Sequence, residues 1–566
     1  MWVKILLLFF VFSFLFRSDT SFDQDLGRHL KLGEIIVNTW GIPKTNLFSY
    51  TNPNFPFVNT HWLFEVMVFE FNQTIGLQWM LILKIILILL SVWLTIKTIP
   101  KENRVLLLPI GFIFLHVLRE RLELRPEIFS FLFTAITLYI LEKFTSKQVS
   151  SDRGTNVLNI RLVFALPIIQ LIWVNTHIYF FIGLMLQAIF ILHLFYQKLR
   201  SHPRGAHTKF LNIIFMLSVI VSFINPNGLQ GLLYPLNVSK NYGYTIVENQ
   251  TLFFLENIKF SDPNFLFVKL SVAIIGLSIV VALIRRQFQL KNILLALSGV
   301  GLALMHVRSF PYLVFLSLPA VIQNFGVMPW KNLGRILTFI TISLLLLETF
   351  FYFNGDYYKY RSDPHKPILK NVESYKSALD FVISHDLPNP IFNNFDIGSY
   401  ILYRGYPKYQ VYVDGRPEAY PKEFFQGEYI PSQADYNNFK KLDEFREFKT
   451  VIFSHTDQTP WGRTFIQNIV KDESWKLVYV DDFIIVSIKG GLASELRLNH
   501  VDLSTLSPAN YKFTDYLPYL RIGLFLLSTG HTDSGTQFIQ KAQQIFPQSP
   551  FINKMLGNPT SSYFIW

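Results

Sequence analysis

The first two thirds of the chain alternate between long apolar segments and short polar ones. Each apolar segment approaches the roughly 20 residues that a helix needs to cross a bilayer. The pattern predicts a polytopic α-helical membrane domain over residues 1–353, with about eleven spans. We expect them near residues 3–17, 76–98, 104–118, 128–143, 162–176, 178–197, 210–224, 264–284, 292–305, 309–326 and 335–353.

Lysine and arginine are concentrated in alternate loops between these predicted spans, for example Lys97, Lys101 and Arg104 after the second span. Such loops face the cytoplasm under the positive-inside rule. The N-terminus is then cytoplasmic, and everything after about residue 354 lies outside a cell membrane that the chain crosses many times. The formal net charge of +12 therefore indicates orientation in the membrane, and no nucleic-acid partner is expected.

The first outer loop, residues 18–75, holds two acids, Asp23 and Asp25, directly after the first span. Asp25 can cap an amphipathic helix that continues to about Thr39 and lies on the membrane. A second amphipathic piece places His61 and Glu65 four residues apart on one helix face. A purely structural role stays open for each: a helix cap for Asp25, and a helix-stabilising pair for His61 and Glu65.

Under this topology, polar side chains from loops far apart in the sequence all fall at the outer membrane surface. Buried polar groups need partners, so we expect them to share one polar site. Arg125 either binds a phosphate or is neutralised by neighbouring glutamates, and Lys84 either points into the site or extends to the interface. His306 is either part of the site or a histidine satisfied within the core. The predicted substrate-binding set is Arg28, His29, His61, Glu65, Lys84, Arg125, His177, His306 and Arg308.

After Tyr352 the pattern changes to that of a soluble domain, and residues 354–495 alternate strand and helix patterns. This alternation favours an α/β sheet. We expect strands at 390–393, 410–414, 450–454, 476–479 and 483–489, and helices at 398–403 and 463–471. Asp396, Asp414 and Arg416 follow strand ends, where α/β domains bind ligands, or else are turn residues joined by a salt bridge.

Residues 496–566 form a helical tail in which Gly523, Gly530, Ala542 and Pro547 keep the spacing of one tetratricopeptide repeat. One such repeat cannot bury a core alone, so we expect it to dock on the α/β domain.

The chain has no cysteine, which excludes disulfides and thiolate metal sites. No cofactor and no metal are expected. The alternative is a divalent ion, which the two acids at positions 23 and 25 could hold together with a nearby histidine.

Several of these segments together resemble the GT-C membrane glycosyltransferases, and within that resemblance a group of prokaryotic polytopic membrane proteins. The segments are Asp23–Gly33, His61–Glu65, Arg125–Glu127, Trp173–His177, Asn225–Gly228, Asn394–Tyr400 and Val413–Arg416.

The resemblance implies transfer of a sugar from a polyprenyl-phosphate carrier to a lipid, glycan or protein acceptor at the outer face, with inversion at the anomeric carbon. It implies that the first-loop acid is the general base, which falls on Asp25 or Asp23. Asp25 is favoured because Arg28 follows one helical turn later. Arg125, Lys84, Arg308 and His306 are candidates for stabilising the charge on the departing phosphate.

The chain departs from oligosaccharyltransferases because it has no Trp-Trp-Asp-Tyr-Gly motif, which argues against asparagine glycosylation. Two other classes of function remain open: a lipid or polysaccharide transporter or flippase, and a non-catalytic membrane scaffold. Transporters usually show repeated halves and polar residues near the membrane midplane, and this sequence shows neither.

Overall fold

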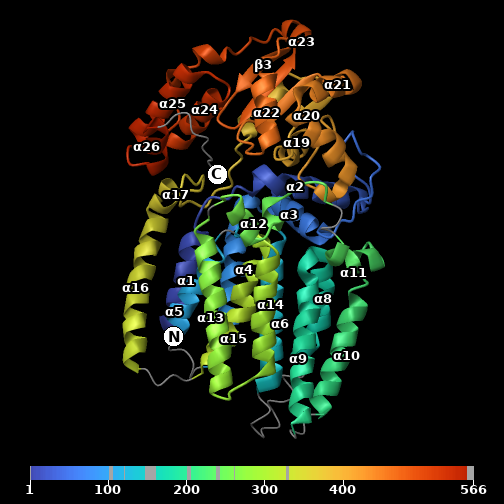
Figure 1. The fold of residues 1–566 in the computed structure, drawn as a ribbon. Helices are drawn as coiled ribbons and strands as arrows, with labels where there is room; N and C mark the ends of the chain where they lie inside the picture. The colour runs from blue at the N-terminus through green and yellow to red at the C-terminus, as the bar shows by residue number, and fades with distance from the viewer. Residues whose placement is uncertain are drawn as a thin grey trace.

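A computed structural model describes residues 2–100, 106–119, 121–146, 161–200, 205–237, 242–260, 262–326 and 331–557. It contains a bundle of long, roughly aligned helices with the C-terminal region set on one end (Figure 1). We call this end of the bundle the domain-side end. The first-loop helices α2 and α3 lie between the bundle and the C-terminal region, while the N-terminus lies toward the opposite end.

The bundle helices coincide with the predicted apolar segments to within a few residues. They are α1 (Trp2–Leu15), α4 (Leu77–Lys97), α5 (Leu107–His116), α6 (Glu127–Ser146), α8 (Ala165–Thr176), α9 (Phe181–Leu199), α10 (Gly205–Val221), α13 (Asn264–Ile284), α14 (Leu290–Met305), a π-helical turn η8 (Leu313–Ser317) continuing into α15 (Leu318–Phe325), and α16 (Lys331–Phe353).

Among the described residues, five helices are long and apolar enough to cross a membrane. They are Leu77–Lys97, Glu127–Thr145, Ile178–Leu199, Asn264–Ile284 and Gly334–Phe353. The remaining bundle helices are apolar but shorter, so the total number of spans stays a prediction. The chain is a membrane protein built from apolar helices.

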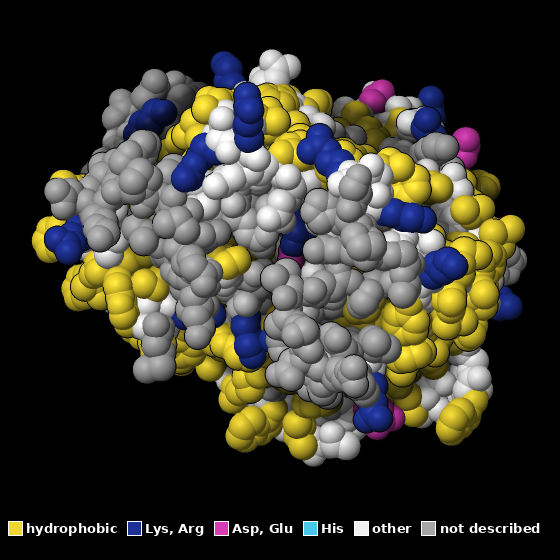
Figure 2. All heavy atoms as spheres, turned by 90° about the horizontal axis from the view of Figure 1, so that it is seen from below, with side chains coloured by type: hydrophobic (Ala, Val, Ile, Leu, Met, Phe, Trp, Pro, Cys, Tyr) yellow, Lys and Arg dark blue, Asp and Glu magenta, His cyan; other side chains and the backbone are white. Residues whose placement is uncertain are grey.

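The end of the bundle opposite the C-terminal region displays many lysine and arginine side chains and few acidic ones (Figure 2). The predicted cytoplasmic loops have this charge pattern. The orientation of the chain in a membrane remains a prediction.

The first loop folds into a π-helical turn η1 (Phe22–Leu26), then α2 (Gly27–Thr39), and later α3 (Trp62–Thr74). The expected capping role of Asp25 is wrong, because the residue before α2 is Leu26 and no side chain caps this helix. The π-helical turn runs directly into α2, so the Asp25 carboxylate is left for other partners. α2 and α3 cross so closely that a Cβ on Gly33 would overlap the Glu65 carbonyl oxygen.

Shorter helices cover the domain-side end and lead into the C-terminal region. They are α11 (Gly228–Asn237), the 3₁₀ turns η4 (Ile178–Phe180), η6 (Val247–Asn249) and η7 (Val307–Ser309), α12 (Leu252–Asn257) and α17 (Asp356–Tyr360).

The C-terminal region begins with what we call the sheet domain, residues 354–495. Its four strands run in the order β1 (Ile391–Asn393), β2 (Thr450–Ser454), β4 (Ile484–Lys489), β3 (Trp475–Val480). β1 and β2 are parallel, and β4 is antiparallel to both of its neighbours. The accompanying helices are α18 (Lys376–Ser384), α19 (Gly398–Gly405), the turns η9 (Pro417–Ala419) and η10 (Phe424–Tyr429), α20 (Ile430–Ala434), α21 (Tyr436–Arg446), α22 (Pro460–Ile469) and α23 (Gly490–Glu495).

The strand expected at 410–414 is wrong. In this segment only Val411 forms a β-bridge, and its partner is Ser49 of the first loop. The edge of β1 is instead satisfied by a side chain: the Asn393 amide donates to the Val413 carbonyl at 2.7 Å and accepts from the Tyr412 N–H at 3.0 Å. A side-chain amide therefore replaces backbone pairing, and the extended segment is left to contact the first loop.

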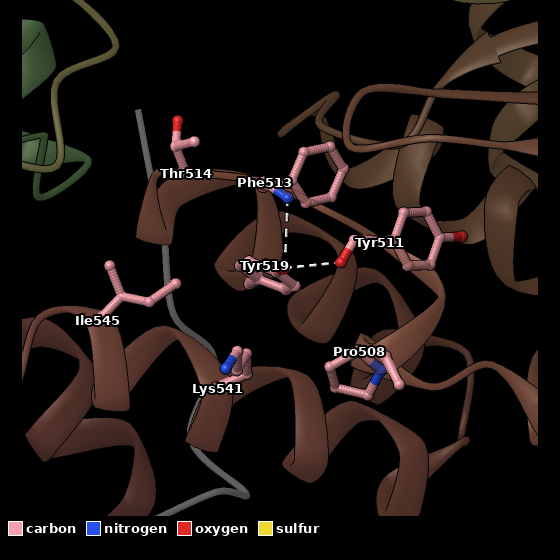
Figure 3. Close-up of a pocket in the computed structure, with 8 residues that line it drawn as sticks. Pro508, Tyr511, Phe513, Thr514, Tyr519, Lys541 and Ile545 are labelled. Atoms are coloured by element: carbon pink, nitrogen blue, oxygen red, sulfur yellow. Dashed lines mark hydrogen bonds between the residues drawn. The ribbon is translucent and has the colours of Figure 1, made fainter.

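The tail contains the 3₁₀ turns η11 (Leu503–Thr505) and η12 (Pro508–Asn510), then α24 (Tyr516–Ser528), α25 (Thr532–Ile545) and α26 (Pro550–Gly557). It contacts the sheet domain through the Arg521–Asp482 ion pair at 3.0 Å and through the stacked rings of His455 and Phe525. A pocket of about 480 Å³ lies beside α24 and α25. Figure 3 shows its aromatic wall, in which the Tyr519 hydroxyl donates to the Tyr511 carbonyl and accepts from the Phe513 N–H.

Candidate functional site

Asp25 lies at the domain-side end of the bundle between two guanidinium groups. One carboxylate oxygen accepts a hydrogen bond from Arg28 Nη2 at 2.9 Å, and the other lies 3.5 Å from Arg125 Nε. About a quarter of the Asp25 side chain is exposed, so a substrate can reach it. Arg28 comes from α2, whereas Arg125 comes from the short loop between α5 and α6. Residues about a hundred positions apart thus meet at one carboxylate.

Glu248 connects the arginines of this cluster. Its carboxylate pairs with Arg125 at 2.7 Å and Arg121 at 2.5 Å, and more loosely with Arg308 at 3.7 Å. Glu248 sits in η6, a single 3₁₀ turn in a loop, where the sequence offered no periodic or motif signal. Sequence reasoning therefore missed it.

Three guanidinium groups of this cluster have an Nε–H that is not saturated. The Nε–H groups of Arg28 and Arg308 are buried without a hydrogen-bond partner, and that of Arg125 has only the long 3.5 Å ion pair with Asp25. Arg28, Arg121, Arg125 and Arg308 carry four positive charges, against three negative charges on Asp25, Glu248 and Glu127, the last of which pairs with Arg121 at 2.8 Å. Buried N–H groups without an acceptor are costly, and an excess of positive charge with free guanidinium donors favours a bound anion.

The electrostatics keep Asp25 ionised. Burial raises the pKa of its carboxyl, but Arg125 and Arg28 outweigh that effect and hold the pKa below its usual value. Burial likewise raises the pKa of Glu248, and its three arginine partners, led by Arg121, bring it well below the normal range. At neutral pH Asp25 is therefore a carboxylate that can accept a proton.

A second group of predicted residues lies beside the first and is made mostly of histidines. Glu65 accepts from His29 Nδ1 at 3.1 Å and from the Asn59 amide at 2.6 Å. The His61 ring lies between His29 and His177, with ring centroids 5.8 and 5.5 Å away. His177 is itself bound by Ser130 at 2.7 Å.

These imidazoles do not supply positive charge. Burial lowers the pKa of His61 to about 3 and brings that of His29 well below its usual value. Burial also raises the pKa of Glu65 to about 7, so this carboxyl titrates near neutral pH. The group offers neutral hydrogen-bonding side chains next to the charged cluster.

Lys84 was predicted to point into the site or extend to the interface, but it pairs with Asp19 instead. Its ammonium bonds Asp19 Oδ2 at 2.7 Å, and both side chains are essentially fully buried. The Leu124 N–H also donates to Asp19 Oδ2 at 3.0 Å, which fixes the loop that carries Arg125. The structure therefore pairs Lys84 with Asp19 and not with a carboxylate of the Asp25 cluster, and sequence reasoning did not foresee this pair.

His306 holds two segments of the site together, because its Nδ1–H donates to the Asn249 carbonyl at 2.8 Å, next to Glu248. This contact brings η6 against η7, which carries Arg308. The side chain of Asp23 lies outside the described residues, so the first-loop acid of the cluster is Asp25 alone.

The two predicted motifs of the sheet domain, Asp414 with Arg416 and Asp396, make different contacts. Asp414 and Arg416 form a buried ion pair at 2.7 Å, as expected for the salt-bridge alternative. Asp396 lies with Asp457, and burial together with the Asp457 charge raises the pKa of Asp396 to about 7. Among the described residues, no group of three or more His, Asp or Glu side chains is arranged to hold a metal ion.

No protein-family model and no curated protein matches the chain. Solved structures do resemble it. The Archaeoglobus fulgidus oligosaccharyltransferase tethered to an acceptor peptide matches with a TM-score of 0.54 at 13% identity, covering 85% of this chain and 72% of the other. The same organism's AglB, in complex with an inhibitory peptide and a dolichol-phosphate, matches with a TM-score of 0.54 at 12% identity, covering 82% and 71%.

The chain has the GT-C fold. At such low identity the likeness establishes the fold alone. The aminoarabinose transferase ArnT from Cupriavidus metallidurans, bound to undecaprenyl phosphate, also resembles the chain at 10% identity over 86% of this chain and 96% of the other. Its TM-score of 0.43 is too low to add to the argument. Within the GT-C fold, the Asp25 cluster lies where the first loop, the bundle and the C-terminal region meet.

Proposed function

We propose that the chain is a membrane glycosyltransferase that takes its sugar from a polyprenyl-phosphate-linked donor. The observation that supports this most directly is the Asp25 cluster, where an ionised and partly exposed carboxylate lies with Arg28, Arg125 and Arg308, and the buried Nε–H groups of these arginines have no hydrogen-bond acceptor. One group can accept a proton while the others bind a phosphate. The GT-C fold is the second support, because the similar AglB structure contains a dolichol-phosphate.

In this mechanism Asp25 is the general base. It takes the proton of an acceptor hydroxyl as the acceptor oxygen attacks the anomeric carbon. The bond between that carbon and the phosphate oxygen breaks, and the polyprenyl phosphate leaves with the bonding electrons. Arg28, Arg125 and Arg308 stabilise its growing negative charge. Attack opposite the leaving phosphate inverts the anomeric carbon.

The histidine group serves in binding rather than in charge stabilisation, since His29 and His61 are neutral at pH 7. Neutral imidazoles and the Glu65 carboxyl hydrogen-bond well to sugar hydroxyls. We assign them to the sugar or the acceptor. The acceptor itself is a lipid, a glycan or a protein hydroxyl at the outer face of the membrane.

The test uses purified protein in lipid vesicles, a panel of polyprenyl-phosphate-linked hexoses and pentoses, and release of polyprenyl phosphate as the readout. We expect Asp25→Asn to lower the rate by about 10²–10⁴-fold, the usual contribution of a positioned base. The matched control is Glu34→Gln, which removes an acid from the same loop that pairs with Lys31 rather than with the cluster. Asp23→Asn compares the two first-loop acids directly.

Full transfer by Asp25→Asn would show that the base is assigned wrongly. Wild-type protein that releases no polyprenyl phosphate from any donor would reject the glycosyltransferase proposal. Movement of the intact donor between vesicle leaflets would then favour a flippase, and its absence would favour a scaffold.

A further inference from the structure

The sheet domain reaches directly over the proposed general base. A Cβ added at Gly415 would lie 3.8 Å from Asp25 Oδ1 and 3.5 Å from the Gln24 carbonyl oxygen. Gly415 directly follows the extended segment 410–414, which does not join the sheet and bridges Ser49 of the first loop through Val411. A residue that follows Asp25 by nearly 400 positions in the sequence thus faces the proposed base.

The contact is fixed on one side by polar bonds to the first loop. Arg416 Nη2 donates to Asn46 Oδ1 at 2.7 Å, and the Asn46 amide donates to the Ala419 carbonyl at 3.0 Å. The Arg416 guanidinium also lies between the rings of Phe48 and Phe57, 4.9 and 4.8 Å from their centroids. Arg416 is almost completely buried. Its salt bridge with Asp414 therefore orients a guanidinium that ties the two parts of the chain together.

The contact is fixed on the other side by close helix packing. α2 meets α19 so tightly that a Cβ on Gly27 would lie 2.9 Å from Tyr403 Cβ and 3.1 Å from the Ser399 carbonyl oxygen. Gly27 is two residues after Asp25. The first loop around Asp25 is therefore fixed to the sheet domain by two contacts, the Arg416 bonds and the packing of α2 on α19. These contacts hold Gly415 close to the Asp25 carboxylate.

Backbone geometry does not require a glycine at position 415, because its φ lies outside the left-handed region. An alanine would meet only one tight neighbour, the Ser399 hydroxyl at 3.3 Å, and this group can rotate. Because glycine has no side chain, space is left next to Asp25 Oδ1. An acceptor hydroxyl must come within about 2.6–3.2 Å of that carboxylate to give up its proton.

We propose that the sheet domain forms the acceptor-side wall of the Asp25 site and that Gly415 sets the size of the acceptor that can reach the base. This inference rests on the proposed glycosyltransferase function. The acceptor is an alcohol larger than water, and its hydroxyl reaches Asp25 Oδ1 past Gly415. Burial raises the pKa of the Glu418 carboxyl in the same segment, and the charge of Arg28 counteracts that rise.

The experiment compares Gly415→Ala and Gly415→Val with wild type in vesicles, using two probe acceptors, methanol and octyl glucoside. We expect transfer to octyl glucoside to fall by about 10-fold or more in Gly415→Val and by less in Gly415→Ala, because the added carbons occupy the space through which the hydroxyl approaches the base. Transfer to methanol and the affinity for the donor should stay close to wild type. The matched control is Gly427→Ala, also in the sheet domain, where an added Cβ meets no atom within 4 Å.

An equal loss with both acceptors, or a lowered unfolding midpoint in Gly415→Val, would mean that the residue acts on structure, and would overturn the proposal. Unchanged transfer to octyl glucoside in an active protein would overturn it too, while leaving the proposed function standing. A wild-type protein that releases no polyprenyl phosphate with either acceptor would reject both proposals together.

Discussion

Replacing Lys84 by methionine tests whether this lysine stabilises the fold or binds the donor phosphate. In the structure its ammonium pairs with Asp19 at 2.7 Å, and the exposed fractions of the two side chains are 1% and 0%. Methionine keeps much of the length of the side chain and removes the charge. Among the described residues, Asp19 would then be a buried carboxylate held only by the N–H groups of Ser21 and Leu124 and by the Ser21 hydroxyl.

Removing one partner of a buried ion pair costs about 3–5 kcal/mol, because the other charge stays buried without compensation. We therefore expect Lys84→Met to lower the unfolding midpoint of the detergent-purified protein by several degrees, and Asp19→Asn to do the same. Removing both charges is often close to neutral. The double variant should thus regain most of the lost stability, which a double-mutant cycle measures directly.

The assay is thermal unfolding followed by intrinsic tryptophan fluorescence, with donor binding measured on the same samples. A Lys84→Met protein with the wild-type midpoint and greatly weakened donor binding would refute this reasoning and make Lys84 a phosphate ligand. A double variant no more stable than either single one would show that the two side chains are not coupled.

Two further predictions concern groups away from the Asp25 cluster. His365 bonds Glu123 at 2.8 Å and Asp363 at 2.5 Å; burial and Arg17 lower its pKa, but the two carboxylates outweigh them and raise it to about 9. This folded-state pKa lies above the ordinary value of about 6.5, so the stabilisation is complete below about pH 6.5 and is lost as the pH rises through about 9. The loss amounts to about 3.4 kcal/mol at most. The unfolding midpoint should fall over that window in wild type and stay flat in His365→Gln; equal slopes would contradict the assignment. In the tail, Gly523→Val should loosen α24 from α25 by about 1–3 kcal/mol, since a Cβ there would lie 2.7 Å from Ile539. Faster hydrogen exchange in α24 than in a Gly491→Ala control is the expected result, and equal exchange would refute it.

Much of the architecture could be predicted from local pattern. Long apolar runs became the bundle helices, and the alternating segments became β1, β2, β3 and β4 with α19 and α22. The error at 410–414 has a clear cause. Residues 410–413 have strand character, but Asn393 pairs its side chain with their backbone, so the choice between strand and extended loop depended on one distant amide.

The candidate site was less predictable. Topology alone indicated that Asp25, Arg28, Arg125 and Arg308 would fall at the same end of the bundle, and the structure brings these four together. Glu248 and Asp19 were not found, because a lone acid in a loop or after a span has no periodic signal. The partner of Lys84 could not be inferred from spacing either, since Asp19 lies 65 residues earlier.

The sequence by itself determined the apolar helices, the long first loop and the presence of a C-terminal region of strands and helices, because apolar length and periodicity are properties of neighbouring residues. Tertiary structure alone decided which cations each acid pairs with, and that Gly415 lies close to Asp25. Those facts depend on distances between segments hundreds of residues apart, and such distances are set by the packing of the whole chain.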